Sequence, residues 1–299
     1  MRTRRSSCRQ RGFTLVEAIV TIVVLGIVAG IVALFIRAPV LGFTESSERA
    51  AASDEADLAL RRIARDLRLA LPNSVRVAAD GSAVEFLLTS AGGRYLAVED
   101  DVPGQPFLDF DNPGNTQFTV VGGTMRPIER GNYIVVYNLG DGIQPSDAYR
   151  YRGGIDAGNT NDMNIAQVVA VDNPSSVAPV VTLEDNPFAR QSVPMASPNR
   201  RFQVVTTPVT YQCVRGADGG NTLVRYWNYP ISAGQNLPPQ GAPRQAVIAA
   251  RVAECGNLFQ YGSAASRRSA LVILNLPLRI RGGKGLVRLV HQVHVDNTP

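Results

Sequence analysis

The amino-acid sequence predicts an α+β protein in which a long N-terminal helix packs on a mainly antiparallel β domain. The first observation is an uncharged apolar run from Ala18 to Ile36. The second is a stretch ahead of Pro72 in which apolar residues recur every three or four positions, the spacing of one helix face. The third is the rest of the chain, where short runs rich in β-branched and aromatic residues alternate with clusters of Gly, Pro, Asn and Asp.

The apolar run predicts a segment that crosses a membrane. From Phe13 to Ile36 there are 24 residues, a helix about 36 Å long at 1.5 Å per residue. The hydrocarbon core of a bilayer is about 30 Å thick, so this length is sufficient. Glu17 is the acidic residue of the segment, and a carboxylate costs about 2.5 kcal/mol near the bilayer centre and less near the interface. Such residues are usually neutralised by a partner, so we expect Glu17 to have one.

The residues before this segment predict its orientation. Five arginines and no acidic residue lie in the first twelve positions: Arg2, Arg4, Arg5, Arg9 and Arg11. Removing these five from the 30 basic residues leaves 25, which equals the number of acidic residues. The high pI therefore belongs to this end and does not indicate nucleic-acid binding. The positive-inside rule places this end in the cytoplasm and the remainder across the membrane.

A second helical stretch is expected from Thr44 to Leu71, with Pro72 ending it. We expect Pro39 and Gly42 to bend or break the helix between its membrane half and this amphipathic half. The predicted apolar face consists of Ala56, Leu60, Ile63, Leu67 and Leu71. The predicted i,i+4 ion pairs on the solvent-facing side are Asp57–Arg61 and Arg62–Asp66. We interpret the arginine run as a solvated helix face rather than a site for an anionic partner.

Everything after this helix is predicted to be β structure, in two sheets of which one lies against the helix. The loops Asp100–Gly114, Asp141–Asn164 and Ser232–Pro243 are expected to be irregular. The predicted strands are Val75–Ala78, Ala83–Leu88, Gln117–Val121, Tyr133–Tyr137, Ile165–Val171, Val180–Leu183, Phe202–Thr206, Thr210–Val214, Leu223–Trp227, Ala246–Val252, Leu271–Ile280 and Leu286–Val295.

The cysteines predict one disulfide. Cys8 lies in the N-terminal basic segment, so Cys213 and Cys255 remain on the far, oxidising side of the membrane. A bridge between them closes a loop of about 40 residues, which is worth about 3–4 kcal/mol on the chain-entropy model. Two free buried thiols are the alternative.

The sequence of the predicted β region contains no recognisable catalytic motif, such as a nucleophile with a neighbouring base. His291 and His294 lie on the last predicted strand, and we expect both on one side of it in structural or surface roles. Gly282-Gly283-Lys284-Gly285 lacks Walker spacing and is expected to form the turn between the last two strands. Asp109-Phe110-Asp111-Asn112 and the stretch from Asp156 to Asp162 carry enough oxygen atoms to suggest Ca²⁺, but neither has EF-hand spacing. We expect Asx-type turns there and no cofactor, with Ca²⁺ as the alternative.

The N-terminal residues carry a recognisable motif. The run Arg11-Gly12-Phe13-Thr14-Leu15-Val16-Glu17, followed by Ala18-Ile19-Val20, resembles the prepilin signature of type IV pilins and type II secretion pseudopilins. The resemblance implies cleavage between Gly12 and Phe13 by a prepilin peptidase, and N-methylation of Phe13. It also implies that the helix assembles into a filament core, where Glu17 pairs with the N-terminal amine of a neighbouring subunit.

Further runs are similar to those of the MshO-type minor pilins of the mannose-sensitive haemagglutinin (MSHA) type IV pilus. This likeness implies major and minor pilins, prepilin peptidase, an inner-membrane assembly platform and the membrane as partners, and no nucleic acid. It places the protein in the inner membrane with a periplasmic domain before assembly, and then in a pilus on the cell surface. The similar runs include 35–40, 56–67, 71–77, 92–95, 135–140, 199–205 and 294–297.

The expected organisation is therefore a leader at 1–12, a membrane and assembly helix at 13–36, an amphipathic helix at 37–72 and a periplasmic β domain at 73–299. The length is greater than that of most major pilins, and by analogy implies a non-enzymatic minor pilin near the tip that helps to initiate assembly. Two alternatives remain open. One is a J-type minor pseudopilin of a type II secretion system, and the other is a membrane-tethered periplasmic binding or adhesion module.

Overall fold

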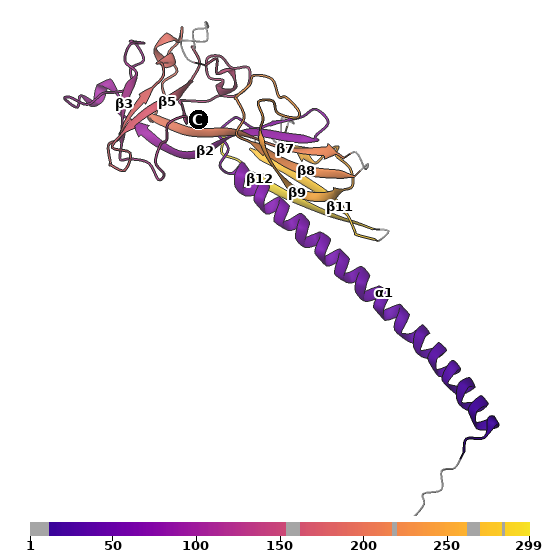
Figure 1. The fold of residues 1–299 in the computed structure, drawn as a ribbon. Coiled ribbons are helices and arrows are strands. Elements are labelled where there is room, and N and C mark those ends of the chain that lie inside the picture. The colour runs from indigo at the N-terminus through magenta and orange to yellow at the C-terminus, as the bar shows by residue number, and fades with distance from the viewer. Residues whose placement is uncertain (1–11, 154–161, 217–219, 262–269, 283–284) are drawn as a thin grey trace, which may run out of the picture. The chain divides into compact units, whose positions relative to one another are not determined.

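One long helix and an antiparallel network of strands make up the structure (Figure 1). The computed structural model describes residues 12–153, 162–216, 220–261, 270–282 and 285–299. The chain forms two compact units, Met1–Ala51 and Ala52–Pro299. The elements are α1 (Leu15–Leu67), β1 (Arg76–Val77), β2 (Ala83–Tyr95), β3 (Gln117–Val121), β4 (Tyr133–Val135), β5 (Ile165–Asp172), β6 (Val180–Leu183), β7 (Arg201–Arg215), β8 (Asn221–Trp227), β9 (Arg244–Val252), β10 (Phe259–Gln260), β11 (Leu271–Arg279) and β12 (Leu286–His294), with short 3₁₀ turns at Val98–Asp100, Ala148–Arg150 and Pro187–Arg190.

In the second unit, the C-terminal part of α1 is a core element. Its predicted apolar face is confirmed, because Ala56, Leu60, Ile63 and Leu67 are each at most 4% exposed. These side chains share one hydrophobic cluster with residues of β2, β7, β8, β9, β11 and β12. The predicted α+β class, with a helix packed on antiparallel strands, is therefore confirmed.

The ends and the middle of α1 differ from the expectation. Of the expected bend or break at Pro39 and Gly42, the break is absent, because the chain remains helical through both residues. It ends at Leu67 rather than Leu71, because the backbone N–H of Leu71 donates to the carbonyl of Leu87 in β2 at 2.8 Å. This strand pairing takes the chain out of the helix before Pro72 is reached.

Asp66 has a different partner from the one predicted. Its Oδ2 accepts hydrogen bonds from the hydroxyl of Tyr211 at 2.7 Å and from Nε of Arg225 at 2.8 Å. The predicted pair with Arg62 is wrong, because Asp66 is on the buried side of the helix, one turn from Ile63, and faces the sheet. The predicted Asp57–Arg61 pair is confirmed at 2.7 Å, on the exposed side.

The strands on the helix side form one continuous sheet. The order is β1, β2, β7, β8, β9 and β11, with β10 and β12 also paired to β11, and all neighbours are antiparallel. Their inward side chains alternate with less buried ones, as in β11, where the buried Val272, Leu274 and Leu276 alternate with half-buried residues. The helix covers the inward face, which defines the first hydrophobic core.

A second core lies inside a closed ring of strands. Among the described residues, β2 pairs with β3, β3 with β6, β6 with β5, β5 with β4, β4 with β7, and β7 back with β2. The long strands β2 and β7 extend from the helix-packed sheet into this ring (Figure 1). Aromatic rings fill it, including Phe118 and Phe202 with centroids 5.6 Å apart. The expected two sheets are thus two parts of one hydrogen-bonded network, because β2 and β7 belong to both.

Most predicted strands are confirmed, with differences in three places. The strand predicted at 83–88 continues to Tyr95 as β2. The runs 202–206 and 210–214 form a single strand, β7, which continues through Pro208. The two-residue strand β10 was not predicted, because its pairing to Leu274 and Ile273 of β11 is a long-range contact. The Gly-rich turn between β11 and β12 falls partly on residues 283–284, which lie outside the described residues.

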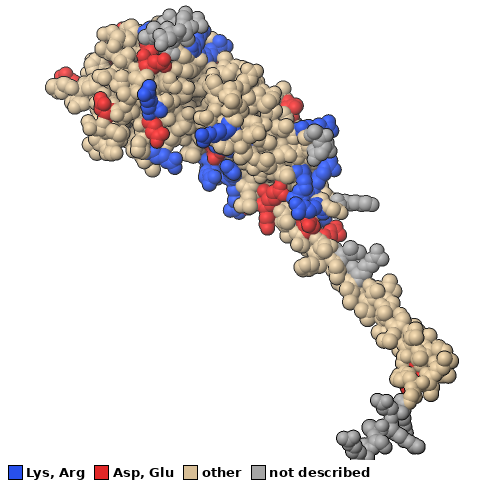
Figure 2. All heavy atoms as spheres, in the orientation of Figure 1, with Lys and Arg blue, Asp and Glu red and all other residues tan. Residues whose placement is uncertain are grey.

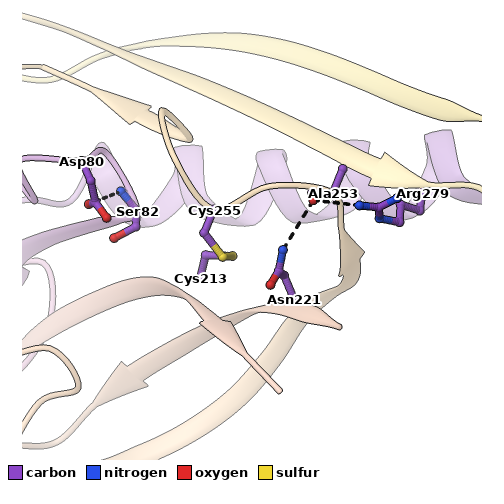
Figure 3. The surroundings of a disulfide bond; sticks show 7 residues. All are labelled: Asp80, Ser82, Cys213, Asn221, Ala253, Cys255 and Arg279. Carbon is purple, nitrogen blue, oxygen red and sulfur yellow. Dashed lines mark hydrogen bonds between the residues drawn. A yellow bond between two sulfur atoms is a disulfide. The ribbon is translucent and has the colours of Figure 1, made fainter. Parts of the chain in front are cut away.

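A disulfide joins Cys213 in β7 to Cys255, which follows β9, with their Cα atoms 5.4 Å apart (Figure 3). The backbone N–H of Cys213 also donates to the carbonyl of Ser82 at 3.0 Å. Nearby, the carbonyl of Ala253 accepts from the side chains of Asn221 and Arg279. The bridge therefore ties the segment after β9 to the sheet on which α1 packs.

Replacing Cys213 and Cys255 together by Ser is expected to lower the free energy of unfolding by about 3–4 kcal/mol, because the unfolded chain regains the entropy of a loop of about 40 residues. Urea titration of the non-reduced proteins measures this difference. Cys8→Ser is the matched control and is expected to leave the stability unchanged. Equal stability of the double variant and the parent would contradict the assigned role.

Asp66→Ala is expected to destabilise the second unit by about 3 kcal/mol, because it leaves the guanidinium of Arg225 largely buried without its carboxylate. The side chains of this pair are each 12% exposed. Asp57→Ala on the same helix removes a pair whose side chains are 50% and 74% exposed, and is expected to cost about 0–1 kcal/mol. Thermal or urea unfolding compares the two variants. A similar loss in both would show that Asp66 contributes no more than a surface charge.

Candidate functional site

The junction between Gly12 and Phe13 is open to an enzyme. Apart from its chain neighbours, no heavy atom of the described residues lies within 4 Å of the Cβ position of Gly12. The Phe13 side chain is 73% exposed. The residues on the other side of the junction, 1–11, are outside the described part of the chain. The predicted cleavage and methylation at this junction remain predictions, and the described geometry places no side chain over the bond.

Thr14 begins the helix as its N-cap. Its carbonyl accepts the first helical hydrogen bond from Ala18 N–H at 3.1 Å. Its hydroxyl accepts from the backbone N–H of Glu17 at 3.3 Å. This is the arrangement that a Ser or Thr N-cap makes with the residue three positions later. The spacing of Thr14 and Glu17 in the sequence is that of a capping box, so the sequence itself carries a local signal for this helix start.

Glu17 is exposed and lies in the first turn of α1. A carboxylate in this turn is favoured by the N–H groups that have no partner within the helix. Its position therefore has a local role in starting the helix. That role leaves the carboxylate accessible to a group from another molecule, because the residue is exposed.

The apolar part of α1 has no protein partner among the described residues. The segment Leu15–Ile36 has a mean hydropathy of 3.1, is long enough to cross a membrane, and contributes nothing to the core. The large apolar side chains from Phe13 to Ile36 are each 47–79% exposed. Figure 2 draws this end of the helix almost entirely without charge. At about 1.5–3 kcal/mol for each large side chain, leaving it in water would cost on the order of tens of kcal/mol.

The proposed Ca²⁺ ligands are explained by local hydrogen bonds where they are described. The carboxylate of Asp109 accepts from the backbone N–H groups of Asp111 and Asn112 and from the side chain of Asn115. These bonds lower the pKa of Asp109 against the opposing effect of burial, which is the larger single influence. The second acidic stretch lies outside the described residues except for Asp162. No group of three or more His, Cys, Asp or Glu that could hold a metal occurs in the residues the structure describes.

The two histidines face opposite sides of β12, so the expectation that they share a side is wrong. They are three positions apart, and neighbouring residues of a strand alternate. His291 lies on the same face as the buried Val293, whereas His294 is on the other face and is exposed. The structure does not bring them together.

The comparisons with known proteins agree with the N-terminal motif. Residues 7–33 match the prokaryotic N-terminal methylation motif. No curated protein and no solved structure matches the chain. The match covers the junction, the cap, Glu17 and most of the apolar segment, and does not extend to the β domain. The chain therefore carries the N-terminal signal of type IV pilins and pseudopilins on an apolar helix fit to anchor such a protein.

Proposed function

We propose that the chain is a non-enzymatic minor pilin of an MSHA-type type IV pilus. The observation that carries the proposal is the methylation motif on a helix whose apolar side chains have no partner within the described chain. A helix of this kind is stable in a bilayer or among other apolar helices. A pilus subunit uses both environments in turn, first as a membrane protein and then as part of a filament.

Removal of residues 1–12 would provide the counter-ion for Glu17. Cleavage after Gly12 creates an amine on Phe13, and all five leader arginines are lost with the leader. Glu17 and this amine then have opposite charges at the same end of neighbouring helices. Their attraction is stronger in an apolar assembly than in water, and it offsets the cost of burying the carboxylate. The pairing therefore requires that the N-terminal ends of neighbouring helices lie close together.

The position near the tip and the role in initiating assembly are supported by the length of the chain and by the runs similar to MshO-type minor pilins. The proposed partners are the prepilin peptidase, the other major and minor pilins and the inner-membrane assembly platform. The β domain would lie in the periplasm before assembly and on the pilus afterwards.

A J-type minor pseudopilin of a type II secretion system is the second candidate. The methylation motif favours it equally, because pilins and pseudopilins share this signal. Deleting the gene separates the two, since loss of surface fibres supports the pilin and loss of protein secretion supports the pseudopilin.

The mature chain is expected to begin at N-methylated Phe13. Mass spectrometry of protein purified from the cells that make it measures the N-terminal peptide. Replacing Gly12 by a bulky residue such as Leu is expected to leave the leader attached, because the junction would no longer fit a peptidase that accepts glycine. A parent chain that keeps its leader, or is cut beyond Ile36, would rule out assembly through this helix.

Glu17→Ala is expected to reduce incorporation into fibres at least about tenfold, equivalent to ~1.4 kcal/mol or more per subunit, while the β domain stays folded. Glu17→Gln is expected to show the same defect, because it keeps the side-chain shape and removes the charge. Quantitative immunoblots of sheared fibres measure incorporation, and thermal unfolding checks the domain. Glu129→Ala, an exposed change in the β domain, is the control. Parent-level incorporation of both Glu17 variants would contradict the pairing.

A further inference from the structure

The loop between β8 and β9 is much longer than the connection requires. The two strands are antiparallel neighbours in the sheet (Figure 1), and such a pair can be joined by about two to five residues. This loop has 16 residues, at positions 228–243. Connections of this length without helix or strand of their own are uncommon and often carry a function.

Most residues that line a cavity of about 290 Å³ belong to this loop. The volume is close to the lower limit of small-molecule sites, about 300 Å³. Glu85 of β2 lines the cavity as well, and its side chain is 4% exposed. The other described residues that line it are uncharged and include Tyr229, Pro230 and Pro239. A small cavity with apolar and neutral walls therefore holds one buried carboxylate.

Arg76 of β1 anchors the loop beside this carboxylate. Its Nε donates to Oε2 of Glu85 at 2.9 Å. Its two terminal nitrogens donate to the backbone carbonyls of residues 232–234 at 2.8–3.3 Å. The guanidinium also lies over the ring of Tyr149, 3.7 Å from the centroid. Because these contacts fix the loop, the cavity is formed before any ligand arrives, which lowers the cost of binding.

Glu85 keeps hydrogen-bonding capacity that the described chain does not use. Its Oε1 accepts from the hydroxyl of Tyr229 at 3.2 Å, and that hydroxyl lies 2.7 Å from the hydroxyl of Thr210. With the bond from Arg76, the carboxylate accepts two hydrogen bonds within the described chain. A carboxylate offers roughly four lone-pair sites, so about two are left for a donor that enters the cavity.

The charge of Glu85 is only partly balanced by Arg76. Burial raises the pKa of Glu85, and this effect exceeds the opposing influence of Arg76. Burial also lowers the pKa of Arg76, but Tyr149, Glu85 and Asp141 together raise it above its usual value. The guanidinium therefore interacts with a second carboxylate, that of Asp141. A further positive charge next to Glu85 would offset the cost of burying it.

We propose that this cavity binds a primary ammonium group, such as that of a small alkylamine. An ammonium is a compact charge with three N–H donors, which suits one carboxylate with free lone pairs. The carbon chain of the ligand lies against Tyr229 and the two prolines. The residues that the structure describes contain no group of three or more His, Cys, Asp or Glu for a metal ion. The site goes beyond the proposed function and does not depend on assembly.

Titration of the full-length protein in detergent with n-butylamine, followed by NMR or calorimetry, tests the chemistry. n-Butylamine is expected to bind at least about tenfold more tightly than n-butanol, which has the same carbon chain and no charge. Tetramethylammonium keeps the charge but has no N–H donor, and is expected to bind at least about fivefold more weakly than n-butylamine. Nα-acetyl-lysine methylamide shows whether the ammonium can come from a lysine side chain as well as from a free amine. Equal binding of the amine and the alcohol, or no binding of the amine, would overturn the proposal.

Two variants test the place of binding. Gly234 lines the cavity, and apart from its chain neighbours no heavy atom of the described residues lies within 4 Å of its Cβ position. Gly234→Phe is therefore expected to fill the cavity without disturbing the fold and to weaken n-butylamine binding at least about tenfold. Glu85→Gln keeps the side-chain shape, removes the charge, and is expected to weaken binding by a similar factor.

Val177→Phe is the control, because it adds the same aromatic ring at a position outside the loop that is 77% exposed. It is expected to bind n-butylamine as the parent does. Thermal unfolding shows whether each variant is folded, and Gly234→Phe decides the outcome if Glu85→Gln does not fold. Parent-level affinity for n-butylamine in folded Gly234→Phe would overturn the assignment of this cavity.

Discussion

The first half of α1 is an apolar rod that no other part of the described chain covers. The hydrophobic effect makes this state unstable in water, so the rod requires lipid or other apolar helices around it. No change within the β domain could meet this requirement, because that domain already fills both of its cores. Membrane insertion and assembly are therefore properties of the first unit, whereas folding stability belongs to the second.

The second half of α1 connects these two roles. It supplies one wall of the helix-packed core, and its polar residues bond to the sheet. Asp66 accepts hydrogen bonds from the side chains of Tyr211 and Arg225. Glu55 accepts hydrogen bonds from the backbone N–H of Ala250 at 2.7 Å and from the side chain of Arg251. These bonds join the part of the helix in the second unit to the strands β7, β8 and β9. The disulfide reinforces the same sheet on the side of β7 and β9.

Features that depend on local periodicity could be predicted from the sequence. The apolar run, the face formed by Ala56, Leu60, Ile63 and Leu67, and most strand positions follow from spacing alone. The pairing of Cys213 with Cys255 was expected because their side of the membrane is oxidising and only these two cysteines lie there. The expectations for the N-terminal site came instead from the resemblance of residues 11–20 to the prepilin signature, of which the methylation motif itself is matched at residues 7–33.

Features that depend on distant partners could not be predicted. The turn of Asp66 toward the sheet is decided by Tyr211 and Arg225, which are far away in sequence. The closed ring depends on β7 pairing with both β2 and β4, and the early end of α1 depends on Leu71 bonding to Leu87. The cap by Thr14 is different, because it is local and its spacing from Glu17 is a sequence signal for the start of the helix.

The central claim is that the apolar rod is not cleaved from the chain, leaves the bilayer and becomes buried among other helices. Fibres sheared from cells, freed of membrane by density separation and examined by mass spectrometry and lipid analysis, test it directly. The account predicts the chain in lipid-free fibres with the segment Leu15–Ile36 present. Recovery of the chain only with membranes, or in fibres without that segment, would contradict it.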